Sequence, residues 1–375
     1  MIRKLKNIYH CVRAIIAILY FRFPARKLKV IGITGTDGKT TTCFYLYNIL
    51  QAAGKKVALI TTIEARFGDD SVDVGLHVTN PDTWDMQKLL RQITDAGMEY
   101  VVLEVTSHGI DQGRVFGVSF MMAGLTNITH EHLDYHKTME EYRRVKMGFL
   151  LSAPKHFITD EIDDQIISGI TINLSGDYNL KNAKLAAAMA VHLGVAKDAI
   201  KAGIENLHFL PGRMEIIVET PFQVIVDFAH TPNGLENVLK SVRSDVNKRG
   251  GRLIHVFGSA GERDFTKRPI MGKIAGEQAD MVVITAEDPR HEKVEAISSA
   301  IVQGIEETGK KLNDNYFTID DRESAIRFAL TILAKTNDTV LITGKGHEKS
   351  MNIDGDEHPW SDQDTVRKIL NLESS

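Results

Sequence analysis

The sequence predicts an α/β protein of two domains, each built on a mostly parallel β-sheet. From Leu28 onward, short β-branched apolar runs alternate with amphipathic stretches, which is typical of βαβ units. A glycine-rich turn that ends in a lysine joins the first of these runs to the helix that follows it. After Leu210-Pro211-Gly212 the alternation begins again, which indicates a second, doubly wound domain.

Length and composition agree with this class. The chain has 375 residues, enough for two large domains or three small ones. With 43% apolar and 25% charged residues, it is neither a disordered, a fibrous nor a multispanning membrane protein by composition. Its two cysteines, Cys11 and Cys43, exclude a disulfide framework and a cysteine-rich metal site, and they favour a reducing cytoplasm.

Charge is distributed unevenly along the chain. Residues 1–29 hold eight Lys and Arg and no acid, whereas the remainder has 37 basic and 49 acidic residues, or −12. That acidic remainder offers no broad surface for nucleic acid. The longest apolar run of the segment, Ala14 to Phe21, is too short to cross a bilayer, and no small-residue cleavage site of a signal peptide follows it. A helix docked on the protein and a helix lying on a membrane surface both remain open.

The elements follow in order. We predict a strand at 29–34, a helix at 39–53 ended by Gly54, strands at 56–62, 100–105 and 122–128, and a helix-rich stretch at 179–193. Leu210-Pro211-Gly212 reads as a hinge. Beyond it, strands are expected at 223–227, 252–257, 280–285 and 339–343. The predicted domains are an N-terminal segment 1–29, a central domain 30–211 and a C-terminal domain 212–375.

Polar clusters stand at Asp227, Gly258, Glu287 and Gly344, directly after the strands of the second domain. Each cluster alone is an ordinary turn. Because ligands of doubly wound sheets bind at the carboxyl ends of the strands, four clusters on one edge predict a binding site.

The strongest local signal lies between the first strand and its helix. Glycines there let backbone N–H groups approach phosphate oxygens, Lys39 can reach the β- and γ-phosphates, and the Thr40 hydroxyl can bind Mg²⁺. A strict P-loop has glycine where Ile33 stands, but the strand, turn and helix context indicates a phosphate site. The candidate nucleotide-binding residues are Gly35, Thr36, Asp37, Gly38, Lys39, Thr40 and Thr41.

Further metal ligands are expected near this loop. Glu104 ends a buried strand, where its carboxylate can complete the Mg²⁺ shell. The run from Thr126 to His136 is rich in metal-binding side chains, and Lys146 follows on a predicted helix. Beside a phosphate loop, a second Mg²⁺ ligand accounts for this run better than a surface cap does. No zinc-binding spacing is present.

Taken in order, these motifs resemble the ATP-dependent Mur ligases, most closely the MurE group that adds the third residue of the muramoyl peptide. The resemblance runs from about residue 30 to 360. It implies a P-loop ATPase domain followed by a Rossmann-like domain. The motifs that carry it are GTDGKTT, LEVTSHGIDQGR, TNITHEHLDYHKTMEEYRRVK, LPGRME, VDFAHTPNGLENVL, VFGSAGERDFTKRPIMGKIA, EDPRHE and GKGHE.

The resemblance implies an ATP- and Mg²⁺-dependent amide ligase, cytoplasmic and monomeric, of peptidoglycan precursor synthesis. ATP would convert the free carboxylate of UDP-MurNAc-L-Ala-D-Glu into an acyl phosphate, which the amine of a diamino acid then attacks. Alternatives are a non-UDP or lipid-linked peptide acceptor presented at a membrane that residues 1–29 contact, L-lysine as the amine, and a non-catalytic ATP-binding scaffold.

The resemblance also implies roles for residues. Lys39 and the loop around it would hold the ATP phosphates, and Thr40 and Glu104 would bind one Mg²⁺. His132 and Lys146 would serve a second metal, Lys146 as a carbamylated lysine. Asn179 would contact adenine, and Asp227 and His230 would act where the C-terminal domain meets the nucleotide. The acceptor would contact Thr79, Asn80, Thr106, Ser107, Gln112 and Arg114, and the incoming amino acid would contact Arg263, Glu287, Asp288, Pro289, Arg290, Gly344 and Glu348.

Several positions depart from the pattern that the resemblance implies. Arg290, whose guanidinium suits the distal carboxylate of meso-diaminopimelate, is kept, but Glu287-Asp288 stands where Asp-Asn is usual. Phe228 replaces a tyrosine, and the stretch 147–175 is shorter than expected. The implied first domain, which holds the UDP of the acceptor, is longer than residues 1–29.

Overall fold

The computed structural model describes residues 13–68, 70–72 and 79–372. They form two compact units, which are described separately. The first comprises the described residues up to Thr129 together with Thr138–His208, and the second comprises His130–Lys137 and the chain from Phe209 onward. Expectations for residues 1–12, which include Cys11 and three of the eight basic residues, lie outside the described part of the chain.

The first unit contains a seven-stranded sheet of order β4-β3-β2-β5-β1-β6-β7. Strand β1 lies between β5 and β6 and runs parallel to both, while β3 pairs antiparallel with β2 and β4. Pairing of β1 with β5 sets Ile33 opposite Glu104, so the end of β5 adjoins the phosphate loop. The strands are β1 (Lys29–Thr34), β2 (Val57–Ile60), β3 (Ala65–Phe67), β4 (Asp70–Val72), β5 (Tyr100–Glu104), β6 (Phe120–Leu125) and β7 (His156–Ile158).

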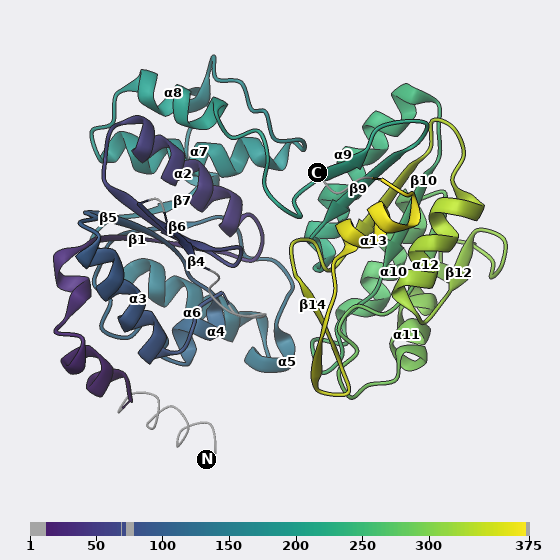
Figure 1. The fold of residues 1–375 in the computed structure, drawn as a ribbon, viewed down its shortest axis with the longest axis horizontal. Coiled ribbons are helices and arrows are strands. Elements are labelled where there is room, and N and C mark those ends of the chain that lie inside the picture. Colours follow the sequence, from purple (N-terminus) through teal and green to yellow (C-terminus); the bar gives the residue numbers. More distant parts are fainter. Residues whose placement is uncertain (1–12, 69, 73–78, 373–375) are drawn as a thin grey trace. The chain divides into compact units, whose positions relative to one another are not determined.

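Helices cover both faces of this sheet (Figure 1), which explains why β1 and β5 are apolar between their end residues. Helices α2, α7 and α8 lie on one face, and α3, α4 and α6 on the other. Gly203 lets α8 approach α2, because a Cβ atom there would lie 2.4 Å from Ile49 Cα. The bounds are η1 (Pro24–Lys27), α2 (Lys39–Ala52), α3 (Thr83–Asp95), α4 (Ser107–Asp111), α6 (Met139–Ser152), η2 (Thr159–Glu161), η3 (Asp164–Ile167), α7 (Tyr178–His192) and α8 (Lys197–Glu205).

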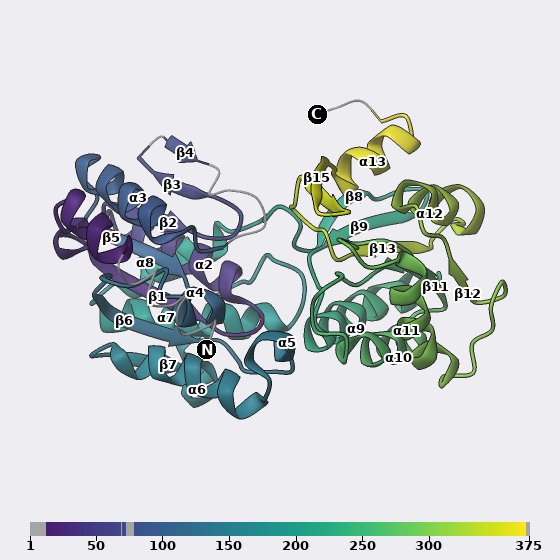
Figure 2. The same ribbon diagram turned by 90° about the horizontal axis from the view of Figure 1, so that it is seen from below.

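The second unit has a six-stranded sheet of order β12-β11-β10-β13-β9-β8, parallel except for β8. Figure 2 shows α9, α10 and α11 on one face and α12 and α13 on the other. The strands are β8 (Glu215–Val218), β9 (Gln223–Asp227), β10 (Leu253–Phe257), β11 (Met281–Ile284), β12 (Tyr316–Thr318) and β13 (Thr339–Thr343), with a separate hairpin of β14 (Ser350–Ile353) and β15 (Asp356–Pro359). The helices are α5 (Leu133–His136), α9 (Pro232–Arg249), α10 (Lys267–Gln278), α11 (Val294–Glu306), α12 (Arg322–Phe328), the π-helix η4 (Ala329–Leu333) and α13 (Asp362–Ile369).

A buried ion pair organises the carboxyl edge of this second sheet. The Arg322 guanidinium donates to both carboxylate oxygens of Asp362 at 2.8 Å, and neither side chain is exposed. The same guanidinium donates to the backbone carbonyls of Ala286 and Thr343 at 2.9 Å. It therefore fixes the loops that leave β11 and β13, from which Glu287 and Gly344 extend.

The predicted fold class is confirmed: two α/β units hold mostly parallel sheets. The long buried strands and the helices between them lie within a few residues of their predicted bounds. Gly212 has a φ of 62° and lies against the backbone of Gly346 and His347, so a Cβ atom there would be 2.1 Å from His347 N. The predicted domain bounds and the hinge at this glycine stay predictions.

Candidate nucleotide and ligation site

The phosphate loop between β1 and α2 can be formed only with glycine at two positions. Gly35 and Gly38 have φ values of 149° and 80°. A Cβ atom on Gly35 would lie 1.8 Å from Thr126 Oγ1, and one on Gly38 would lie 2.2 Å from Asn182 Oδ1. The motif therefore encodes both the backbone conformation and the close approach of two neighbouring segments.

The segment after β6 supports the loop. The Asp37 carbonyl accepts from Thr126 Oγ1 at 2.6 Å and from Asn127 Nδ2 at 3.1 Å, and the Asp37 N–H donates to Asn127 Oδ1 at 3.0 Å. The Thr129 N–H donates to Thr36 Oγ1 at 2.9 Å. Sequence reasoning treated this run as a source of metal ligands and missed its supporting role, although Thr-Asn at the end of a strand adjacent to β1 was a usable signal.

Oxygen donors for a cation meet at the start of α2. Thr40 Oγ1 donates to Glu104 Oε2 at 2.9 Å, and the Thr62 N–H donates to the same oxygen at 3.2 Å. Both Thr40 and Glu104 are buried. A hydroxyl and a carboxylate oxygen are ligands that Mg²⁺ accepts, so this pair fits the predicted metal site. Lys39 lies in the loop itself, where its Nζ donates to the Thr36 carbonyl at 2.7 Å.

Lys146 is buried on α6 beneath the loop. Its Nζ donates to the Gly35 carbonyl at 2.6 Å and lies 4.8 Å from the centroid of the Tyr142 ring. Burial, and next the charge of Lys39, hold the pKa of Lys146 well below its usual value. The site therefore favours an uncharged amine. His132 belongs to the second unit, so its predicted pairing with Lys146 stays a prediction.

Four of the predicted acceptor-binding residues, Asn80, Thr106, Gln112 and Arg114, form one hydrogen-bonded network centred on Asn80. Asn80 Nδ2 donates to the Glu104 carbonyl at 2.7 Å, and its Oδ1 accepts from the N–H and Oγ1 of Thr106. Arg114 donates to the Asn80 carbonyl at 2.7 Å and to Gln112 Oε1 at 2.9 Å. Thr79 bonds Thr62 through their hydroxyls at 2.8 Å, and Ser107 is buried at the start of α4. The network therefore begins at the backbone carbonyl of Glu104, the residue whose carboxylate accepts from Thr40.

Asn179 is linked to the phosphate loop through one neighbour. Its Nδ2 donates to the Ser175 carbonyl at 2.7 Å, and its Oδ1 accepts from Asn182 Nδ2 at 3.0 Å. Asn182 is the side chain that lies against Gly38. Sequence reasoning named Asn179 and missed Asn182, three residues along the same buried helix face.

In the second unit, Asp227 and His230 shape the turn that leads into α9. The Asp227 carboxylate accepts from the N–H groups of Met214 and Ala229, each at 2.7 Å. His230 Nδ1 lies 2.9 Å from the Phe228 carbonyl. These contacts hold the backbone of the turn in place, and the predicted roles of Asp227 and His230 at the nucleotide stay predictions.

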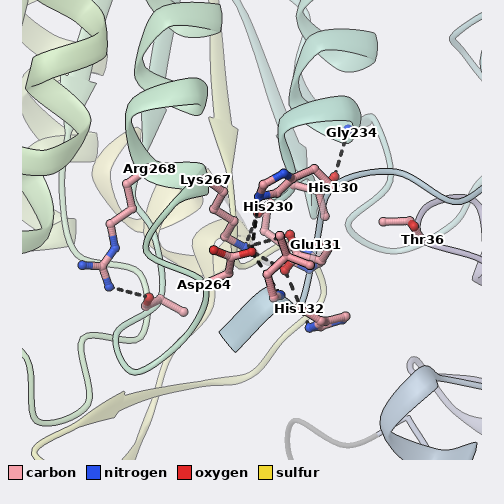
Figure 3. A network of polar contacts seen from close by, with 12 residues as sticks. Thr36, His130, Glu131, His132, His230, Gly234, Asp264, Lys267 and Arg268 are labelled. Carbon is pink, nitrogen blue, oxygen red and sulfur yellow. Dashed lines mark hydrogen bonds and ion pairs between the residues drawn. The ribbon is translucent and has the colours of Figure 1, made fainter. Parts of the chain in front are cut away.

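A buried cluster lies next to this turn (Figure 3). Lys267 Nζ lies 3.0 Å from Glu131 Oε1 and donates to the His230 carbonyl at 2.7 Å. His132 Nδ1 lies 3.8 Å from Glu131 Oε1, and Asp264 Oδ2 accepts from the Leu133 N–H at 3.2 Å. Residues 130–137 are thus tied to α10. No local pattern could have predicted this, because the partners are more than 130 positions apart.

The loops predicted to hold the amino acid carry their own counter-charges. Buried Lys345 lies 2.7 Å from Asp288 Oδ1 and 2.6 Å from Glu348 Oε2. Asp288 Oδ1 also accepts from the Asn352 N–H at 3.0 Å. Both carboxylates are therefore fixed by the protein itself.

Two arginines accompany these carboxylates. Arg290, which follows Pro289, has a φ of 53° and pairs its backbone with β14. Burial, and next the charge of Arg290, lower the pKa of Arg263, while the carboxylates of Asp134, Glu131 and Asp288 act to raise it. Two guanidinium groups thus influence one another at this edge of the sheet.

Glu287 differs from Asp288 and Glu348 in its hydrogen bonding. It is buried, and its Oε2 atom has no hydrogen-bond partner among the described residues. Burial raises the pKa of Glu287 to about 7. A Cβ atom on Gly344 would lie 2.6 Å from Oε2, so only glycine leaves room for this side chain.

Two kinds of feature are absent from the described residues. Across the described residues, no group of three or more His, Cys, Asp and Glu side chains gathers as a metal site. In the same residues, no helix is both long and apolar enough to cross a membrane.

Comparison with known proteins identifies the family. Residues 33–168 match the Mur ligase middle domain, and residues 212–346 match the Mur ligase glutamate ligase domain. UDP-N-acetylmuramoyl-L-alanyl-D-glutamate–2,6-diaminopimelate ligase 1 of Clostridium acetobutylicum is 36% identical over 380 residues, which span 89% of this chain and 76% of that protein. The chain belongs to the Mur ligase family.

Solved structures agree with this assignment. A UDP-N-acetylmuramoyl-L-alanyl-D-glutamate–2,6-diaminopimelate ligase is 28% identical with a TM-score of 0.55, covering 92% of this Mur ligase and 78% of that chain. Folylpolyglutamate synthase of Mycobacterium tuberculosis reaches a TM-score of 0.72 over 97% and 96% of the two chains, but at 18% identity it shows the fold alone. Mur ligases are ATP-dependent amide ligases that use a divalent metal, and this chain belongs to that enzyme class.

Proposed function

We propose that this Mur ligase adds a diamino acid, meso-diaminopimelate rather than lysine, to UDP-MurNAc-L-Ala-D-Glu in peptidoglycan precursor synthesis. The observation that carries the proposal is the contact of Thr40 with Glu104 beside a loop that only glycines can form. The network from Thr106 to Arg114 adjoins this contact and offers donors to an acceptor carboxylate. The resemblance to a ligase of that substrate pair supports the same assignment.

The chain's own residues suit each step. N–H groups of the loop and Lys39 would bind the phosphates of ATP, so that the acceptor carboxylate can attack the terminal phosphorus, break its bond to the bridging oxygen and form an acyl phosphate while ADP leaves. Thr40 and Glu104 would hold Mg²⁺, which neutralises charge on the phosphates. The amine of the incoming amino acid would then attack the acyl carbon, and phosphate would leave.

Arginine chemistry supports meso-diaminopimelate as the amine. Its second amino acid group carries a carboxylate that lysine lacks, and a guanidinium can bind a carboxylate through two hydrogen bonds. Arg290 and Arg263 lie at the edge where four strand ends converge. Asp288 and Glu348, held by Lys345, would complete a pocket of alternating charge.

An assay matrix tests the proposal. Purified protein would be supplied with ATP, Mg²⁺, one acceptor and one amino acid, and phosphate release and amide product would be measured together. We expect turnover only with UDP-MurNAc-L-Ala-D-Glu and meso-diaminopimelate. Binding of ATP without turnover for any pair would instead identify a nucleotide-binding scaffold and end the proposal.

Lys146 offers a test of the second metal site. An uncharged amine can attack CO₂ and, on losing a proton, become a carbamate, whose oxygens could serve a metal together with His132. Lys146→Ala should lose activity, and a small added carboxylate should restore part of it. Undiminished turnover of Lys146→Ala would remove this role.

A second acceptor class is favoured by one observation. The helix at residues 13–20 exposes large apolar side chains, which suits an enzyme that works on a lipid-linked peptide at a membrane. Faster turnover of a UDP-free, lipid-linked acceptor than of the UDP-linked one would establish this alternative.

A further inference from the structure

The helix at residues 13–20 has two apolar faces, of which the protein covers one. Ala14, Ala17 and Ile18 are at most 8% exposed, whereas exposure reaches 47% at Ile15, 53% at Ile16, 58% at Leu19 and 68% at Tyr20. The exposed four are spaced so that they form one stripe along the helix. A stripe of this size, unlike single exposed apolar residues, indicates a surface that contacts something.

Contacts of the covered face and of the residues at both ends of this helix fix it to the first unit. Tyr20 and Phe21 lie against Trp84 of α3, with ring centroids 5.1 and 5.3 Å apart, and Arg13 forms an ion pair of 3.1 Å with Asp82 (Figure 1 shows the helix in dark purple near α3). Ile18 lies against Gly117, where a Cβ atom would be 2.2 Å from Ile18 Cδ1. The exposed stripe is therefore held in place.

Positive charge adjoins the stripe. The chain turns at Arg22 and Phe23, both with left-handed backbones, into η1. Arg22, Arg26 and Lys27 are exposed there. Residues 1–29 contain no acid, although the rest of the chain is strongly acidic. A surface that is apolar in the middle and cationic at its end matches an anionic lipid bilayer. The basic side chains would contact the anionic headgroups, and the apolar stripe would contact the acyl chains.

We propose that residues 13–27 bind the surface of a bilayer containing anionic lipid, with Ile15, Ile16 and Leu19 inserted below the headgroups and Tyr20 at their level. The helix would lie in the interface, and no described helix is both long and apolar enough to cross a membrane. Tyr20 and its neighbour Trp84 suit the headgroup level, where such rings concentrate. A second copy of the chain fits less well, because it would set two cationic segments against each other. The proposal does not depend on which substrates the ligase joins.

Vesicle flotation of the full chain tests this surface. We expect it to float with vesicles of phosphatidylcholine containing roughly 30% phosphatidylglycerol, and only weakly with phosphatidylcholine alone or at high salt. The double variant Ile16→Gln/Leu19→Gln should lower the lipid affinity at least about ten-fold. Arg22→Gln/Lys27→Gln should lower it less and remove much of its salt dependence.

A matched control separates the stripe from apolar exposure in general. Ile332 is 66% exposed on η4 of the second unit, and Ile332→Gln should float like the unchanged protein. Circular dichroism and ATP binding check that each variant is folded. Flotation that is absent, indifferent to anionic lipid or unchanged in Ile16→Gln/Leu19→Gln would overturn the proposal. A lipid-free dimer that the same variant dissociates would show that a second copy covers the stripe.

Discussion

In the first unit the phosphate loop is held by backbone groups and neutral side chains, whereas in the second unit the carboxyl edge of the sheet is held by buried ion pairs. Gly35 and Gly38 are shaped by contacts with Thr126 and Asn182. At the second edge, Lys267 pairs with Glu131, and Lys345 with Asp288. A loop that binds anions keeps its N–H groups available for phosphate. A sheet edge that carries several buried charged side chains needs each of those charges to be paired within the protein.

This difference predicts where charge removal acts. In the first unit, loss of a charged side chain should remove activity and leave stability nearly unchanged. In the second unit, it should unfold the structure before any substrate effect can be seen. The predictions below test this contrast, beginning with the largest expected effect.

Lys267→Ala should destabilise the second unit by about 3–5 kcal/mol, because it leaves Glu131 buried without its counter-ion. Denaturant unfolding of the full chain measures the change. Lys273 lies on the same helix but forms an exposed ion pair of 3.4 Å with Glu307, so Lys273→Ala should cost less than about 1 kcal/mol. Lys267→Met/Glu131→Leu should recover much of the loss. Equal stability of Lys267→Ala and Lys273→Ala would contradict the contrast.

Lys39→Ala should lower kcat/KM by about 10²–10³, since one positive group near the developing charge is removed. Lys39 Nζ donates to the Thr36 carbonyl of its own loop, so the free energy of unfolding of Lys39→Ala should stay within about 1 kcal/mol of the original. Lys55 is exposed shortly after the end of α2 and gives the matched control. Lys55→Ala should keep the original kcat/KM. Unfolding of Lys39→Ala would show that the loop depends on side-chain charge after all.

More of the site could be predicted from the sequence in the first unit than in the second. The glycine loop and Glu104 were predicted together because each follows a strand and their geometry is local. Strands of three residues, such as β3, β7 and β12, were not predicted, because so few residues show no clear period. The pairing of Glu131 with Lys267 arises from chain folding alone, and residues assigned to substrate, such as Asp288, proved to hold Lys345 as well.

Glu287→Gln should change the pH dependence of stability. Because burial raises the pKa of Glu287 to about 7, the folded state binds a proton more tightly than the unfolded state, so stability falls as pH rises from about 4.5 to 7. The glutamine variant lacks this loss and should be more stable than the original by up to about 3 kcal/mol at about pH 8, and similar to it below about pH 5. Unfolding at both pH values measures this. Asp356→Asn, on the exposed β15, should leave the pH profile unchanged.

Thr106→Ala should give a small stability change and the most specific functional one. Thr106 Oγ1 caps α4 by accepting from the Gly109 N–H at 3.0 Å, and it also donates to Asn80 Oδ1 at 3.0 Å. Thr138 caps α6 in the same way, accepting from the Glu141 N–H at 3.1 Å. Each alanine variant should therefore lose about 1 kcal/mol of stability.

Only Thr106 adjoins the network that begins at Glu104, so only Thr106→Ala should raise KM for the acceptor while KM for ATP stays unchanged. A cap that served stability alone would move neither KM, and Thr106→Ser, which keeps the hydroxyl, should restore the original value. Equal kinetics for Thr106→Ala and Thr138→Ala would assign the Asn80 network to folding. In that case the first unit would recognise its acceptor by the loop backbone, as we propose for phosphate, and the contrast with the charged edge of the second unit would become sharper.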